Sequence, residues 1–252
     1  MSLKESEYSG IAVTVDLDWA CEPAIEYTLG YLDRNKIPYT VFTTHNSKAV
    51  EKRLNNIEVG LHPFFHPDSS HGAGINDVVN HITSLNYNLK AYRCHRFSVS
   101  NEIKDVMKKA GMLISSNVCT DISIVKPFYD RFQVLEVPVF LEDGSYLLNE
   151  HPLIPTDRIK LKLIQEGLKV IVIHPMHFAI NTPEWDYMLD IKQKHTWEEW
   201  NAIAEENLDK LKSNKLGIRN FLENLFEHID KSKLDYVTIG KVSRKFSDFF
   251  NG

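Results

Sequence analysis

The sequence predicts an α/β fold in which helices surround a parallel sheet. Short apolar segments with strand character alternate with helical segments along the chain, which is the pattern of successive βα units. With 252 residues the chain has the length of one α/β barrel, and a 43% hydrophobic content suffices for a large core. No linker of biased composition divides the sequence. We therefore expect a single domain over residues 1–252.

The strands are predicted from runs of β-branched, aromatic and other apolar residues bounded by turn residues. They fall at 11–18, 39–44, 57–61, 91–93, 112–116, 134–141, 170–174 and 236–239. Helical periodicity predicts helices at 22–35, 47–55, 75–86, 100–110 and 156–166. Gly111 is expected to form a left-handed cap after the fourth of these. Thr196 and Glu199 have the spacing of a capping box that opens a helix to about residue 213, and a further helix is expected at 217–230.

Composition and charge exclude several classes of protein. The 29 Lys and Arg residues against 34 Asp and Glu give a net charge of −5, without the basic footprint of a nucleic-acid-binding protein. The basic residues within 241–245 indicate a solvated terminal helix. The three cysteines lack zinc-finger or CxxC spacing, and buried thiols in a reducing compartment explain them. No signal-peptide pattern and no apolar run long enough to span a membrane is found, so we expect a cytoplasmic protein.

Two aspartates end the first predicted strand. Alternate residues of a strand point to the same side, about 6.6 Å apart, so Asp16 and Asp18 are expected to face one way. The apolar residues before them predict a buried strand, and two like charges at its end are costly unless a cation or solvent receives them. The alternative is that Asp18 simply caps the next helix.

Two histidines follow the third predicted strand in the stretch His62-Pro63-Phe64-Phe65-His66-Pro67. The prolines exclude a helix. A straight strand would hold the two rings roughly 13 Å apart, whereas two ligands of one zinc ion each lie about 2.1 Å from it. A shared ion therefore requires a tight turn at Pro63, and the alternative is two unrelated loop histidines. Together with the aspartates, these histidines form the inventory of a mononuclear metal hydrolase.

The candidate residues share one position on the predicted fold. Asp16, Asp18, His62, Arg93 and His174 all lie at or just past the C-terminal ends of apolar strands. In a parallel barrel these ends meet at one mouth. We therefore expect residues far apart in the sequence to converge there.

These motifs resemble the NodB-type polysaccharide deacetylases of carbohydrate esterase family four, in the branch whose first motif is Asp-x-Asp. The chain is most similar to deacetylase-like proteins of bacterial O-antigen and capsule biosynthesis. The resemblance covers about residues 11–246 and implies a distorted, parallel (β/α) barrel of about seven strands with the active site at the C-terminal strand ends. It implies that Asp16 is the catalytic base and that Asp18, His62 and His66 hold the metal.

The later motifs of the family match in part. Its third motif begins with an arginine that orients the base, matched by Arg93-Cys94-His95-Arg96. The family usually has proline where His95 stands, which leaves open whether Arg93 or Arg96 reaches Asp16. The last motif matches Val170-Ile171-Val172-Ile173-His174, so His174 is the candidate general acid, with His177 as the alternative. The family's fourth motif, with its aspartate and tryptophan, is not found.

The resemblance implies a metal-dependent hydrolase that removes the N-acetyl group of an amino sugar in surface polysaccharide biosynthesis. Zinc is the expected metal, although cobalt, nickel, manganese and iron also suit nitrogen and oxygen ligands. Because no export signal is seen, the expected substrate is a precursor or oligosaccharide. Aromatic residues in the insertion 182–200 are candidates for sugar stacking or for core packing: Trp185, Tyr187, Trp197 and Trp200. The alternatives are hydrolysis of another linear amide or an acetyl ester, and a noncatalytic carbohydrate-binding relative.

Overall fold

The computed structural model describes residues 9–250 and the side chains as far as residue 246. Its described residues form a nine-stranded sheet in the order β6-β7-β5-β4-β3-β2-β1-β9-β8. All neighbouring strands are parallel except β6 and β7. The strands are β1 Gly10–Asp16, β2 Tyr39–Thr43, β3 Glu58–Leu61, β4 Ala91–Tyr92, β5 Ile114–Ser115, β6 Phe128–Tyr129, β7 Leu135–Glu136, β8 Leu141–Glu142 and β9 Leu168–Ile173.

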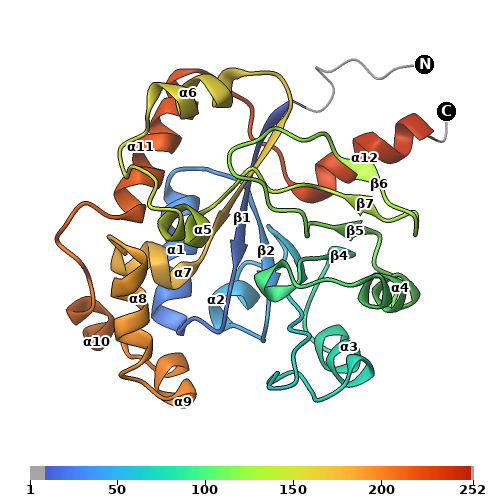
Figure 1. The fold of residues 1–252 in the computed structure, drawn as a ribbon, viewed down its shortest axis with the longest axis horizontal. Helices are drawn as coiled ribbons and strands as arrows, with labels where there is room; N and C mark the ends of the chain where they lie inside the picture. Colours follow the sequence, from blue (N-terminus) through green and yellow to red (C-terminus); the bar gives the residue numbers. More distant parts are fainter. Residues whose placement is uncertain (1–8, 251–252) are drawn as a thin grey trace.

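Helices surround this sheet, as Figure 1 shows. They are α1 Glu22–Arg34, α2 Lys48–Glu51, α3 Ile75–Thr83, α4 Asn101–Lys109, α5 Asp143–Leu148, α6 Asp157–Ile164, α7 Pro175–Ile180, α8 Trp185–Lys192, α9 Trp197–Asn201, α10 Glu205–Lys210, α11 Ile218–Lys231 and α12 Ile239–Phe250. The alternation of strands and helices confirms the predicted α/β class with a curled, mostly parallel sheet.

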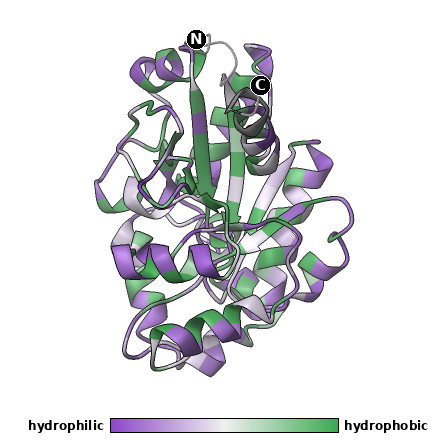
Figure 2. Cartoon of the chain, turned by 90° about the vertical axis from the view of Figure 1, so that its right-hand side faces the viewer, coloured by the Kyte–Doolittle hydropathy of each residue, from purple (hydrophilic) through white to green (hydrophobic). Residues whose placement is uncertain are grey.

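The core lies on both faces of the central strands, because successive residues of a strand point to opposite sides. On one face Val13 and Val15 of β1 pack with Ile171 and Ile173 of β9 under helices α1, α7 and α11. On the other face Ala12 packs with residues of β2, β9 and α12. Figure 2 shows the resulting apolar centre within a more polar layer of helices.

The structure has more and shorter strands than the sequence predicts. The predicted strand 134–141 is two strands, β7 and β8, on either side of Pro138, which lacks the backbone N–H that a central strand needs. The predicted strand 236–239 is wrong. Tyr236 forms only an isolated bridge to Ile11, and the chain then enters α12, where Gly240 N–H donates to Glu58 Oε2 at 2.7 Å.

Two further boundaries differ. The capping box at Thr196 is confirmed, but its helix α9 ends at Asn201, and a second short helix, α10, follows instead of one continuous helix to residue 213. Strand β1 ends at Asp16, two residues earlier than predicted. Within residues 9–250 no helix is both long enough and apolar enough to cross a membrane.

Candidate metal centre and acid–base pair

Asp18 lies in a turn directly after β1. Asp18 and Trp19 both have left-handed backbone, with φ angles of 46° and 52°, a conformation that is costly for residues other than glycine and common at functional sites. Hydrogen bonds hold the turn, from Ala20 N–H to Leu17 O at 2.7 Å and from Trp19 N–H to Thr44 Oγ1 at 3.3 Å. The turn places the Asp18 carboxylate at the C-terminal edge of the sheet.

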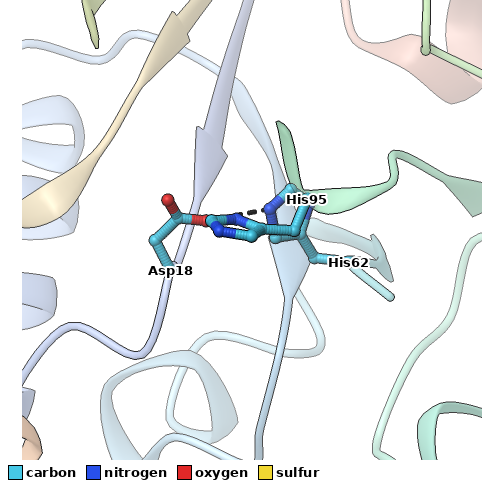
Figure 3. Close-up of side chains that lie close together, drawn as sticks. All are labelled: Asp18, His62 and His95. Atoms are coloured by element: carbon cyan, nitrogen blue, oxygen red, sulfur yellow. Dashed lines mark hydrogen bonds and ion pairs between the residues drawn. The ribbon is translucent and has the colours of Figure 1, made fainter. Parts of the chain in front are cut away.

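Two histidines converge on one oxygen of Asp18, as Figure 3 shows. His62 follows β3, and its Nε2 lies 2.9 Å from Asp18 Oδ1. His95 follows β4, and its Nδ1 lies 3.0 Å from the same oxygen. Neighbouring ligands of one ion with bonds of about 2.1 Å are about 3.0 Å apart in octahedral and about 3.4 Å apart in tetrahedral coordination. This set of one carboxylate and two imidazoles therefore fits a divalent transition metal.

His66 is not brought to this cluster. Its Nδ1 accepts a hydrogen bond from Asp68 N–H at 3.2 Å, its ring stacks on Phe64, and its side chain is 46% exposed. The backbone turn lies at His66 to Ser69, closed by the bond from Ser69 N–H to His66 O, rather than at Pro63. The turn therefore comes too late in the chain to direct both histidines of the predicted pair toward Asp18.

Asp16, the last residue of β1, is paired with Arg93 in the interior. Arg93 Nη1 donates to Asp16 Oδ1 at 2.7 Å, and the arginine is fully buried over the Phe42 ring. Its other donors bind Thr14 Oγ1, Ser116 O and Ser116 Oγ. Of the two arginines in the third motif, the structure thus brings Arg93 to Asp16. The second oxygen of Asp16 lies 3.9 Å from His62 Nδ1, so Asp16 borders the histidine cluster.

His174 faces the other oxygen of Asp18. It follows β9 as the N-cap of α7, and its Nε2 lies 3.4 Å from Asp18 Oδ2. Its Nδ1 lies 2.5 Å from Asp143 Oδ1 and 3.2 Å from Glu142 Oε1, and its backbone N–H donates to Asp143 Oδ2 at 2.8 Å. Asp143 therefore holds both the ring and the backbone of His174, with Nε2 turned toward the site.

The charges in the site depend on one another. Burial alone would raise the pKa of Asp18, but the nearby His174 and His95 and hydrogen bonds from His62 and His95 bring this pKa well below its usual value. Burial works to lower the pKa of His174, but Asp143, Asp18 and Glu142 outweigh it and raise this pKa well above its usual value. These shifts favour an ionised Asp18 and a protonated His174.

Comparisons with known proteins identify the family. The family model "WbmS-like: Polysaccharide deacetylase" matches residues 13–192. The chain belongs to the WbmS-like polysaccharide deacetylase family. The curated proteins contain no match to it.

The first of three solved structures compared with this WbmS-like chain shares its fold. A Bordetella bronchiseptica protein assigned as a polysaccharide deacetylase involved in O-antigen biosynthesis is 21% identical, with a TM-score of 0.75 over 87% of this chain and 91% of that one. A Mycobacterium smegmatis protein assigned as a polysaccharide deacetylase is 14% identical, with a TM-score of 0.46 over 95% and 96% of the two chains. A Bacillus anthracis family-four pseudoenzyme, BA3943, is 11% identical, with a TM-score of 0.45 over 94% and 66%.

Three residues of this WbmS-like site escape the sequence motifs. His95 stands where the family motif has proline. The sequence therefore identified this position as a difference from the family pattern and did not indicate a metal ligand there. Glu142 and Asp143 come directly after the predicted strand 134–141. Their position at the end of an apolar strand was the available signal, because the C-terminal ends of parallel strands meet at the mouth.

The alternative acid and the aromatic insertion also have defined places in the WbmS-like fold. His177 is buried, hydrogen-bonds through Nδ1 to Thr182 Oγ1, and stacks on Trp185. Burial lowers its pKa well below the usual value. Tyr187 donates to Leu211 O and Trp200 is buried, while Trp197 is exposed. Trp200 thus belongs to the core, whereas the Trp197 side chain faces solvent.

A buried histidine outside the cluster fixes the loop between β3 and α3. His71 Nδ1 accepts from Phe64 N–H at 3.2 Å, and its Nε2 donates to Thr44 O at 3.0 Å. The ring also packs against Trp19. Burial, helped by His81, lowers the pKa of His71 to about 4. The neutral ring therefore links the turn that carries Asp18 to the loop that carries His62.

This pKa predicts a loss of stability in mild acid. An unfolded histidine has a pKa of about 6.5, so at pH values between about 6.5 and 4 the unfolded chain binds a proton that folded His71 does not. The stabilising contribution of His71 to the free energy of unfolding is fully present above about pH 6.5. It decreases as the pH is lowered and is smaller by about 2 kcal/mol at pH 5. Urea denaturation at pH 7.5 and 5.0 measures the loss of unfolding free energy between the two pH values. This loss should be smaller by about 2 kcal/mol in His71→Gln than in the wild type. An equal dependence in both proteins would contradict this role.

Proposed function

We propose that this protein removes the N-acetyl group of an amino sugar, using one divalent metal ion held by Asp18, His62 and His95. The observation that carries the proposal is the arrangement around Asp18. Two imidazoles meet one of its oxygens, and His174, held by Asp143, faces the other. A ligand set and an acid group are thus adjacent, with Asp16 on the other side of His62.

The metal and the setting are parts of the same proposal. Zinc is our first choice, and cobalt, nickel, manganese and iron also suit the donor set. Such an ion polarises an acyl oxygen and lowers the pKa of a water molecule beside it. Membership of a polysaccharide deacetylase family, and the role given for the Bordetella protein, favour surface polysaccharide biosynthesis as the setting. A cytoplasmic location stays a prediction.

Asp16 is the proposed general base. In this role its carboxylate accepts a proton from the water whose oxygen attacks the acetamide carbon. Arg93 supports it, because a buried guanidinium 2.7 Å from Asp16 Oδ1 favours the ionised carboxylate and fixes one of its oxygens. The second oxygen stays available on the side of His62. Arg93 thus orients the Asp16 carboxylate through one oxygen and leaves the other oxygen free to accept a proton.

His174 is the proposed general acid. Once the tetrahedral intermediate has formed, the C–N bond breaks and His174 gives a proton to the departing nitrogen. The products are acetate and the free amino sugar. Asp143 and Glu142 on its Nδ1 side favour the protonated ring and hold Nε2 toward Asp18. His177 is less suited to this role, because its lowered pKa keeps it neutral.

These contacts also bear on the noncatalytic alternative. The features in its favour were a third motif without proline and an undetected fourth motif. In the fold, Arg93 still pairs with Asp16, and Asp143 still orients His174. This arrangement of a candidate base, a candidate acid and three candidate ligands supports an active hydrolase over a carbohydrate-binding relative.

Acetate release tests this function. Zinc-loaded protein should release acetate from soluble N-acetylated precursor sugars or short oligosaccharides, and a chelator should abolish the release until metal is restored. Chitin and peptidoglycan in the same assay should give little or none. Chelator-insensitive release, or comparable release from insoluble polymer, would contradict the proposal.

A further inference from the structure

Two cations border the site without acidic partners. Arg96 and Lys192 are both exposed. Among residues 9–250 no carboxylate lies within 4.0 Å of either charged group. The acidic residues of the site have other partners within 4.0 Å: Asp16 pairs with Arg93, Asp143 and Glu142 lie against His174, and Asp18 lies against the site histidines. Arg96 and Lys192 therefore bring to the mouth two positive charges that form no direct ion pair within the described residues, although the whole chain has a net charge of −5.

Arg96 stands on the His95 side of the mouth. It lies within the short turn His95–Phe97 and has left-handed backbone, with φ of 58°. Its guanidinium lies 5.8 Å from the centre of the Phe64 ring, which is itself 4.9 Å from the His95 ring. Trp19 is next to both Phe64 and His95. Arg96 thus lies at the edge of a half-buried aromatic surface beside the candidate ligands.

Lys192 approaches the site from the other side. It is the last residue of α8, and its ammonium lies 5.4 Å from the centre of the Trp200 ring. The same ammonium is close enough to Asp18, Arg96 and His177 for their charges to act on it. Although Lys192 is exposed as a residue, partial desolvation of its ammonium lowers its pKa, Asp18 raises it, and the like charge of Arg96 lowers it further. Two like charges near each other are unfavourable unless an anion joins them.

We infer that Arg96 and Lys192 bind an anionic group of the substrate, a phosphate or a carboxylate attached to the acetamido sugar. The inference rests on the proposed function and specifies its substrate class. Arg93 is unsuited to this task, because it is fully buried and all its recorded donors are used inside the protein. The planar fork of Arg96 suits either anion, and the aromatic surface of Trp19 and Phe64 lies where a sugar ring would follow.

Equilibrium binding tests the inference. Calorimetric titration of zinc-loaded protein would use three probes in both the gluco and galacto series: the neutral N-acetylhexosamine, its 1-phosphate and the corresponding N-acetylhexosaminuronic acid. We expect at least one anionic probe to bind about tenfold or more tightly than its neutral parent, with the preference falling as salt is raised. The anionic probe that binds more tightly identifies whether the anionic group of the substrate is a phosphate or a carboxylate.

Charge-removing variants assign the preference to the two residues. Arg96→Gln/Lys192→Gln should bind the anionic and neutral probes within about threefold of each other. Arg158→Gln on α6 and Lys241→Gln on α12 are matched controls, exposed and near the opposite strand ends, and should keep the preference. A preference that survives in the double variant, as expected for an anion bound by the metal alone, overturns the inference. Equal binding of the anionic and neutral probes by the wild-type protein would also overturn the inference. Anion-dependent binding without acetate release from any probe would overturn the deacetylase proposal and leave this inference supported.

Discussion

Replacement of His95 by alanine should weaken metal binding by about a hundredfold or more, because it removes one of three proposed ligands. His62→Ala should do the same. Both rings are expected to bind the ion because their nitrogen atoms lie 2.9 and 3.0 Å from the same oxygen of Asp18. Elemental analysis after gel filtration, together with a competition titration for zinc, measures the effect.

His66→Ala is the matched control. His66 belongs to the same loop as His62, yet its ring stacks on Phe64 and its Nδ1 is bonded to Asp68 N–H. We expect this variant to retain its metal. Loss of metal from His66→Ala combined with full occupancy in His95→Ala would restore the ligand set that the family resemblance implies.

The second large effect is expected at the base. Asp16→Asn should retain its metal and lose acetate release by a factor of about 10² to 10⁴, the contribution typical of a general base. Asp18→Asn should lose both metal and turnover. The Asp16→Asn substitution would also leave the buried Arg93 without its counter-charge, which costs about 3 to 5 kcal/mol. Thermal denaturation must therefore accompany the assay, at a temperature where the variant is folded.

An aspartate–arginine pair far from the site provides the control. Arg53 Nε donates to Asp33 Oδ2 of α1 at 2.7 Å, with Asp33 exposed and Arg53 partly buried, and pairs near the surface contribute about 1 kcal/mol or less. Asp33→Asn should leave turnover within about twofold. If folded, metal-loaded Asp16→Asn keeps more than a tenth of wild-type turnover, another group removes the proton and the assignment is wrong.

The fold and part of the site follow from local sequence patterns. Asp16, Arg93 and His174 each end an apolar strand, and parallel strands place such ends at one edge of the sheet. Alternation within the strands therefore suffices to bring these residues to the mouth. Asp18 reaches it differently, through a left-handed turn that alternation does not predict.

The rest of the site depends on tertiary contacts. The direction of His95 is set by a three-residue turn after a two-residue strand, with its backbone N–H bonded to Pro63 O. The position of the turn at His66 depends on Ser69, and Asp143 is placed by the pairing of β8 with β9. None of these has a periodic pattern, so the sequence pointed to His66 and gave no reason to place His95 beside Asp18 or Asp143 beside His174.

The location of the metal tests the central claim most directly. Diffraction data collected at the zinc absorption edge from a zinc-soaked crystal would show bound zinc as an anomalous peak. We expect one peak within bonding distance of Asp18, His62 and His95, about 2.0 to 2.2 Å from each ligand atom. A peak between His62 and His66 with His95 turned away, or no peak at Asp18, would contradict the proposed metal centre.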